Sequence, residues 1–142
     1  MPNIRWLIAL ITAVHRFLYR VTKGRIGAGS GNRKFLLLTH VGRKTGRLRV
    51  TPLLYVEDDD HWVVIGSNAG DDRHPAWWLN LQSHPSVEIQ VGGNRFAVQA
   101  RAATAEESER LWPKFIAVYK DYETYRARTT RTIPIVILEK AA

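Results

Sequence analysis

Apolar and polar residues alternate along most of the chain with the period of β-strands. Segments of strand length run from 35 to 41, 47 to 57, 61 to 67, 86 to 91, 95 to 103 and 132 to 140. The turns at 42–46, 58–60 and 92–94 are too short for the crossover helices that parallel strands need. The pattern therefore predicts a small, mostly antiparallel barrel and disfavours a doubly wound parallel sheet.

Two helices interrupt these strands. Pro75 suits the first position of a short helix, because its missing N–H would have no partner there. Thr104 followed by Glu107 has the form of a capping box, which predicts a second helix from about 105 to 119. Pro134 lies early in the last strand, where a missing backbone donor favours an edge or a bulged position.

The first 23 residues follow a helical period instead. Arg5, Arg16 and Arg20 fall on a narrow basic face, opposite a broad apolar face that contains Trp6 and Phe17. Ten residues separate Arg5 from Arg16, and a membrane-spanning helix needs about twenty apolar ones. The pattern is typical of a helix that lies on an anionic membrane, and equally of one packed on its own domain or on a second copy.

Glycine content separates a connector from the barrel domain in the rest of the chain. Residues 24–33 contain four glycines, which predicts a connector, and the barrel domain is expected over 34–142. The chain of 142 residues is 45% hydrophobic and 24% charged, as in folded globular domains. The absence of cysteine excludes disulfides and thiolate metal sites and fits a reducing compartment such as the cytoplasm.

The net charge of +8 is unevenly distributed. The first 50 residues contain eleven Lys or Arg and no Asp or Glu, whereas the remainder is slightly acidic. A basic half predicts an anionic partner that binds there, such as a phosphate, a polycarboxylate or a lipid headgroup. No nucleic acid is expected, because the cations fall on one hairpin and one helix stripe without a recognition module.

The turn over 42–49 contains four of these cations, namely Arg43, Lys44, Arg47 and Arg49. Backbone N–H groups of a glycine-bounded turn approach anions closely, and Arg adds bidentate donors. The turn is therefore either a phosphate or carboxylate site or a solvated basic tip. It is not a P-loop, because a strand follows it.

Other candidate chemistry is sparse. Tyr119, Tyr122 and Tyr125 are three residues apart, so on a helix their rings would share one side, either as core and lid aromatics or as functional phenols. Ser67 lacks the surroundings of a hydrolase nucleophile. The histidines have no ligand spacing, and no metal is expected.

Several motifs resemble the deazaflavin-dependent nitroreductase family. They are LLLTHVGRKTGRLRVTPLLYV, IGSNAG, HPAWWLNLQSHPSVEIQV, the Trp112–Pro113 helix that leads to the three tyrosines, and RTIPIVILE. The resemblance implies an FMN-binding-like split β-barrel flanked by helices. It also implies an oxidoreductase in which reduced coenzyme F-420 gives a hydride to a quinone or nitroaromatic acceptor. The alternative is a non-catalytic carrier of F-420 or of a flavin.

The same resemblance implies a set of site residues. Those expected to bind the coenzyme are Arg43, Lys44, Arg49, Thr51, Pro52, Ser67, Asn68, Ala69, Gly70, Trp77 and Asn80. Those expected at the acceptor are Tyr119, Tyr122, Tyr125 and Ser67. Leu54 departs from the pattern, because nitro-reducing relatives often have an aromatic residue there. A homodimer completes the expectations, together with a cytoplasmic location, either free or peripheral on the inner face of the plasma membrane.

Overall fold

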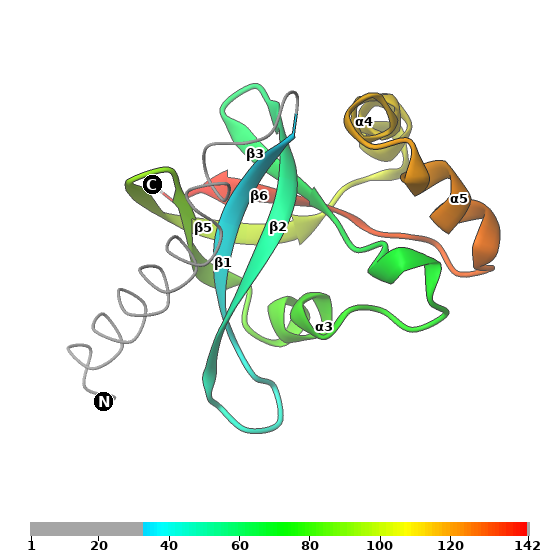
Figure 1. The fold of residues 1–142 in the computed structure, drawn as a ribbon. Coiled ribbons are helices and arrows are strands. Elements are labelled where there is room, and N and C mark those ends of the chain that lie inside the picture. The colour runs from blue at the N-terminus through cyan, green and yellow to red at the C-terminus, as the bar shows by residue number, and fades with distance from the viewer. Residues whose placement is uncertain (1–32, 142) are drawn as a thin grey trace.

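The computed structural model describes residues 33–141, which form a closed, six-stranded antiparallel barrel flanked by helices (Figure 1). The elements are β1 Lys34–Val41, β2 Leu48–Asp58, β3 His61–Ile65, η1 Asn68–Gly70, α3 Ala76–Ser83, β4 Ser86–Val91, β5 Asn94–Ala102, α4 Ala105–Val118, α5 Asp121–Arg128 and β6 Ile135–Lys140. The order around the barrel is β1-β2-β3-β6-β5-β4, which confirms the predicted architecture. The predicted helix over 1–23 and nearly all of the connector lie outside the described residues.

The first hairpin is the longest pairing in the barrel. Its register runs from Lys34 opposite Tyr55 to Val41 opposite Leu48, so the basic turn lies at the far end of two long strands. In Figure 1 this turn extends below the barrel. β2 continues through Pro52, which lies opposite Leu37.

The last strand is not at an edge. β6 pairs with β3 on one side and with β5 on the other, because the barrel has closed. Pro134 lies just before β6, where its carbonyl accepts a hydrogen bond from the Gly66 N–H at 2.9 Å. Of the two positions predicted for Pro134, an edge or a bulge, the edge is wrong, because β6 has partners on both sides in the closed barrel.

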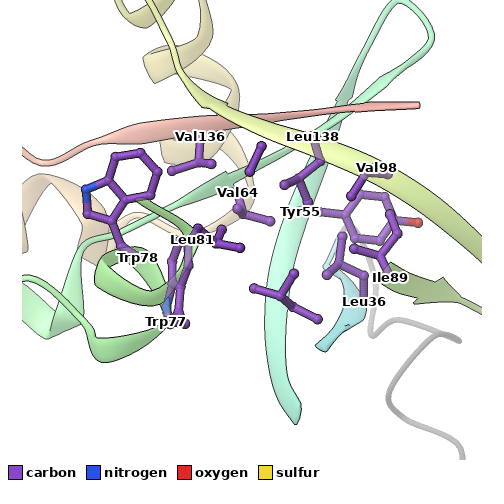
Figure 2. Packing of buried hydrophobic residues seen from close by; sticks show 12 residues of the cluster. Leu36, Tyr55, Val64, Trp77, Trp78, Leu81, Ile89, Val98, Val136 and Leu138 are labelled. Carbon is purple, nitrogen blue, oxygen red and sulfur yellow. The ribbon is translucent and has the colours of Figure 1, made fainter. Parts of the chain in front are cut away.

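Two cores lie on the two sides of the barrel wall. Val64 and Val136 belong to the interior cluster, whereas their sequence neighbours Val63 and Ile135 belong to a cluster beneath α4 and α5. This alternation follows from the two-residue period of a strand, and it explains why β3 and β6 are apolar on both faces. Figure 2 shows Trp77, from α3, beside the interior side chains.

The predicted capping box begins α4. The Glu107 N–H donates to Thr104 Oγ1 at 3.2 Å, and the Thr104 N–H donates to Glu107 Oε1 at 2.9 Å. The helix ends at Val118, and a separate short helix, α5, follows from Asp121. The predicted end of the helix near 119 is confirmed, whereas the separate helix α5, which lies against η1, was not predicted.

Candidate functional site

A cavity of about 500 Å³ lies beside the barrel wall, where β2, η1, α3 and the start of α5 meet. Ligand sites in proteins commonly have this size. In Figure 1 these elements surround the right-hand side of the lower barrel. The lining residues are Arg33, Phe35, Pro52, Leu53, Leu54, Ile65, Ser67, Asn68, Ala69, Pro75, Trp77, Tyr119 and Tyr122. Eight of these thirteen residues are apolar, and the others bring hydroxyl groups, one amide and one charged side chain to the lining.

The loop after β3 enters the cavity in a strained conformation. Asn68 and Ala69 have φ angles of 46° and 54°, in the left-handed region that residues with a Cβ seldom adopt. Strain of this kind persists only where surrounding contacts impose it, and it is frequent at ligand sites. The loop is held at its start by the bond from Gly66 to Pro134 and in its middle by Arg128, which donates to the Ala69 carbonyl at 3.1 Å.

Arg131 donates three hydrogen bonds to backbone carbonyls of this loop. Its Nη2 donates to the carbonyls of Gly66 and Ser67 at 3.1 and 2.9 Å, and its Nε donates to the Asp71 carbonyl at 2.9 Å. The remaining Nη1 lies 3.2 Å from His74 Nδ1. One guanidinium thus fixes both ends of the segment that contributes Ser67 to the cavity. Its importance was not predicted, since its partners are about sixty residues away in sequence.

Gly70 is where the strained loop touches α5. Its φ is 80°, and an added Cβ would lie 2.9 Å from both the Cα and the carbonyl oxygen of Tyr125. We expect Gly70→Ala to lower the free energy of unfolding by about 1–3 kcal/mol and to weaken coenzyme binding, because the loop must withdraw from α5. Gly93→Ala is the matched control, as nothing lies within 4 Å of its added Cβ. Denaturant unfolding measures the change, and a Gly70→Ala variant with the parent's free energy of unfolding would contradict the close contact between the loop and α5.

The three tyrosines gather at the break between α4 and α5. The Tyr119 and Tyr122 rings are 5.1 Å apart and nearly perpendicular, and the Tyr125 ring is about 6 Å from each. Tyr119 and Tyr122 line the cavity, whereas Tyr125 lies one layer behind, with its hydroxyl 3.0 Å from that of Tyr119. Tyr122 is 7% exposed and packs edge-on against Phe115. The predicted shared side is thus formed across a helix break rather than along one helix.

The phenols at the cavity are held in their neutral form. The hydrogen bond to Tyr125, and then the nearby Asp121 carboxylate, raise the pKa of Tyr119 above its usual range. Burial, followed by the charge of Tyr125, raises the pKa of Tyr122 to about 12. Both side chains therefore keep their protons at physiological pH and can donate hydrogen bonds to an oxygen that gains negative charge.

The basic turn is closed by its own backbone and leaves its cations in solvent. The Gly42 N–H donates to the Arg47 carbonyl and the Gly46 N–H to the Gly42 carbonyl, both at 2.8 Å. Its cations, Arg43, Lys44, Arg47 and Arg49, are exposed. Within residues 33–141, no carboxylate forms an ion pair with any of these four. Their charge is therefore available to an anion from outside.

Asn80 does not line the cavity but holds the turn from behind. Its side chain is 2% exposed, and its Oδ1 accepts from the Arg43 N–H at 3.0 Å. Its Nδ2 lies 3.0 Å from His40 Nδ1, and His40 Nε2 lies 2.8 Å from Thr51 Oγ1. An amide that donates to Nδ1 fixes the tautomer with hydrogen on Nε2, which then donates to Thr51. Asn80 and Thr51, both predicted as coenzyme contacts, are thus joined through a buried histidine.

His40 is neutral in this network. Burial, and then the charge of Arg49, lower the pKa of His40 to about 4. A protonated ring would direct an Nδ1–H at the Asn80 amide hydrogens, so the neutral form is the one the network requires. As acceptor from His40, Thr51 keeps its own hydroxyl hydrogen for another partner. Sequence analysis missed His40, because its role depends on Asn80, forty residues away.

The predicted site residues thus form two groups joined by β2. Pro52, Ser67, Asn68, Ala69, Trp77, Tyr119 and Tyr122 line the cavity, whereas Arg43, Lys44, Arg49, Thr51 and Asn80 form or support the turn. Pro52 lies three residues along the strand from Arg49, which corresponds to about 10 Å. Arg33, at the end of the predicted connector, was not predicted but lines the cavity. A molecule with a ring system and an anionic chain fits this arrangement.

Comparison with known proteins identifies the family. The profile of the F420H(2)-dependent quinone reductase family matches residues 12–140. An F420H(2)-dependent quinone reductase of Mycobacterium tuberculosis is 39% identical over 148 aligned positions, which cover 99% of each chain. A solved F420-H2 dependent reductase superposes with a TM-score of 0.68 at 34% identity, over 74% of this chain and 93% of that one.

Two further solved structures bear on the architecture. One, described as a domain-swapped dimer, has a TM-score of 0.69 at 30% identity and covers 91% of this chain and 98% of its own. The haem storage protein of Vibrio cholerae shares only the fold, with a TM-score of 0.52 at 19% identity over 78% and 84% of the two chains. The split-barrel fold, the oxidoreductase class and the coenzyme expected from sequence are confirmed by the family match. The chain belongs to the F420H(2)-dependent quinone reductase family.

Proposed function

We propose that this protein binds reduced coenzyme F-420 across the turn and the cavity and reduces a quinone beneath Tyr119 and Tyr122. The observation that carries the proposal is the continuity between an unpaired cluster of cations and an apolar, phenol-capped cavity along one strand. Bound coenzyme supplies the hydride, and one further proton completes the quinol. The protein's task is then to bind, to orient and to exclude water.

The turn is suited to the phosphate and carboxylates of the coenzyme's tail. Arg43 and Arg49 offer bidentate donors and Lys44 a mobile charge, all exposed in the same turn. The bond from Arg43 N–H to Asn80 and the one between His40 and Thr51 hold the turn and its strands in place before a ligand arrives. Preorganised cations lose less freedom on binding, which favours affinity.

The cavity is suited to a flat, mostly apolar ring system. Pro52, Leu54 and Trp77 supply apolar walls, and Ser67 and Asn68 supply polar groups at the strained loop. A ring held there would lie next to the tyrosine cluster. The rigidity given by Arg131 keeps the loop in one conformation, which matters because hydride transfer depends on close, aligned approach.

Tyr119 is the best-placed proton donor in this arrangement. It lines the cavity, is protonated at physiological pH, and is hydrogen-bonded to Tyr125, which stands behind it. A proton lost from Tyr119 to a quinone oxygen would be replaced through Tyr125 or from solvent. Ser67 and Tyr122 would donate hydrogen bonds to the same quinone oxygen as it gains negative charge. Each such donor lowers the activation barrier by about 3 kcal/mol.

The finer details of the acceptor remain predictions. A nitroaromatic acceptor is one, with Leu54 in the cavity wall where nitro-reducing relatives often have an aromatic residue. A second prediction is that residues 1–23 bind an anionic membrane surface, from which the protein takes up its quinone. Within residues 33–141, no helix has the length and apolar character that crossing a bilayer requires.

A homodimer is supported by the relative described as a domain-swapped dimer.

The proposed reaction is tested by following the absorbance of reduced F-420 with menadione as acceptor, together with titrations of F-420, FMN and haem. We expect menadione-dependent oxidation and binding of F-420 in preference to FMN and haem. Binding of F-420 without turnover on any quinone would identify a carrier instead. Tight binding of FMN with no binding of F-420 would overturn the proposal.

A further inference from the structure

Arg33 is the one charged side chain among the described residues that line the cavity. It lies at the end away from the basic turn, about 20 Å along β1 from the residues that pair with that turn. Its guanidinium carbon is 4.9 Å above the centre of the Tyr119 ring. The cation therefore stands at the acceptor's end, stacked on the phenol that we place over the acceptor.

No carboxylate within residues 33–141 neutralises Arg33. Its neighbour Lys34 differs, because its ammonium lies 4.0 Å from Glu57 Oε1 and its side chain does not line the cavity. Stacking on Tyr119 orients the guanidinium and removes some of its freedom in advance. The planar edge of that group is left to donate to a ligand.

The charge of Arg33 also acts inside the cavity. Burial and the charge of Tyr125 raise the pKa of Tyr122, and Arg33 opposes them by favouring the phenolate. Arg33 is thus close enough to the cavity interior to interact with an anion there. Arg33 itself is exposed, so it stands at the rim of the cavity, next to the apolar wall that Phe35 and Leu54 supply.

We propose that Arg33 and the Tyr119 ring form an anion subsite that selects acceptors with a carboxylate, sulfonate or enolate attached to the quinone ring. This inference rests on the proposed function, because the acceptor is what would occupy that end of the cavity. The coenzyme's own anionic chain is expected at the other end, on the turn from Arg43 to Arg49. The two anionic groups would then be held apart by two separate sets of cations.

The test compares Arg33→Met with Lys34→Met, which changes the net charge equally one residue away. The acceptors are menadione and 2-hydroxy-1,4-naphthoquinone, which share a ring system and differ in charge at neutral pH. For Arg33→Met we expect the KM for the anionic quinone to rise about tenfold, which corresponds to one charge-assisted contact. The KM for the anionic quinone should rise at least fivefold more than the KM for menadione, the Kd of F-420 should change less than twofold, and Lys34→Met should match the parent throughout.

Calorimetric titration of the F-420-loaded protein with the anionic quinone supplies a readout that needs no turnover. We expect its Kd to rise about tenfold in Arg33→Met, and the difference to shrink as salt screens the pair. Equal effects on both quinones, or a weaker Kd for F-420 instead, would overturn the subsite. Loss of turnover with every quinone while the anionic quinone still binds through Arg33 would count against the proposed reaction and leave the subsite standing.

Discussion

Arg49→Glu is expected to weaken binding of coenzyme F-420 by about 100-fold. The substitution removes a charge-assisted hydrogen bond, about 1.5–3 kcal/mol, and places a carboxylate against the anionic chain of the ligand. Arg49 is exposed, and within residues 33–141 no carboxylate pairs with it, so the fold itself should be little affected. Fluorescence titration of F-420 measures the change directly.

Arg95→Glu is the matched control for this variant. It makes the same change in net charge on the hairpin between β4 and β5, where Arg95 lies 3.9 Å from Glu88 and does not line the cavity. We expect it to weaken the Kd of F-420 by less than threefold, since charges separated by more than a Debye length are largely screened. A similar loss of affinity for F-420 in both variants would show that the turn attracts the coenzyme only through the net charge of the protein.

Asn80→Leu is expected to destabilise the protein and to weaken coenzyme binding together. The leucine leaves the Arg43 N–H and His40 Nδ1 without their partner, and an unsatisfied buried polar group costs about 1–3 kcal/mol. The free energy of unfolding should therefore fall by about 2–5 kcal/mol. Binding of F-420 should weaken about tenfold, because the turn loses its anchor. Denaturant unfolding and fluorescence titration measure the two effects.

Gln82→Leu on the same helix provides the comparison, because Gln82 is exposed. We expect that variant to keep the parent's stability and affinity. Destabilisation by Asn80→Leu with an unchanged Kd for F-420 would show that the network supports the fold alone. An unchanged free energy of unfolding in Asn80→Leu would contradict the hydrogen bonds from Asn80 to Arg43 and His40.

The barrel was predictable because its determinants are local. Alternation in segments such as 86–91 and 95–103, together with a short glycine turn, identifies a hairpin before any tertiary contact is considered. The capping box at Thr104 is equally local and lies as predicted. Closure of the barrel was less accessible, and the edge position inferred for Pro134 failed because β6 acquires partners on both sides.

Sequence alone pointed to many residues of the candidate site, but not to the contacts that they make in the structure. The turn over 42–49 was identified from charge and glycine alone, and the family resemblance supplied most of the cavity wall. Asn80 was expected among the coenzyme contacts, and in the structure it lies outside the cavity lining and accepts a hydrogen bond from the Arg43 N–H of the turn. His40, Arg131 and Arg33 contribute through partners that are distant in sequence, and neither local pattern nor composition reports such pairings.

We expect the exposed cations of one turn to hold the anionic chain of the coenzyme while its ring occupies the cavity under the tyrosines. A crystal structure of the protein with F-420 bound tests it most directly. The phosphate and carboxylates should lie at Arg43, Lys44 and Arg49, and the deazaflavin ring between β2 and Tyr119. An ordered chain elsewhere on the protein, with the turn free in solvent, would contradict it.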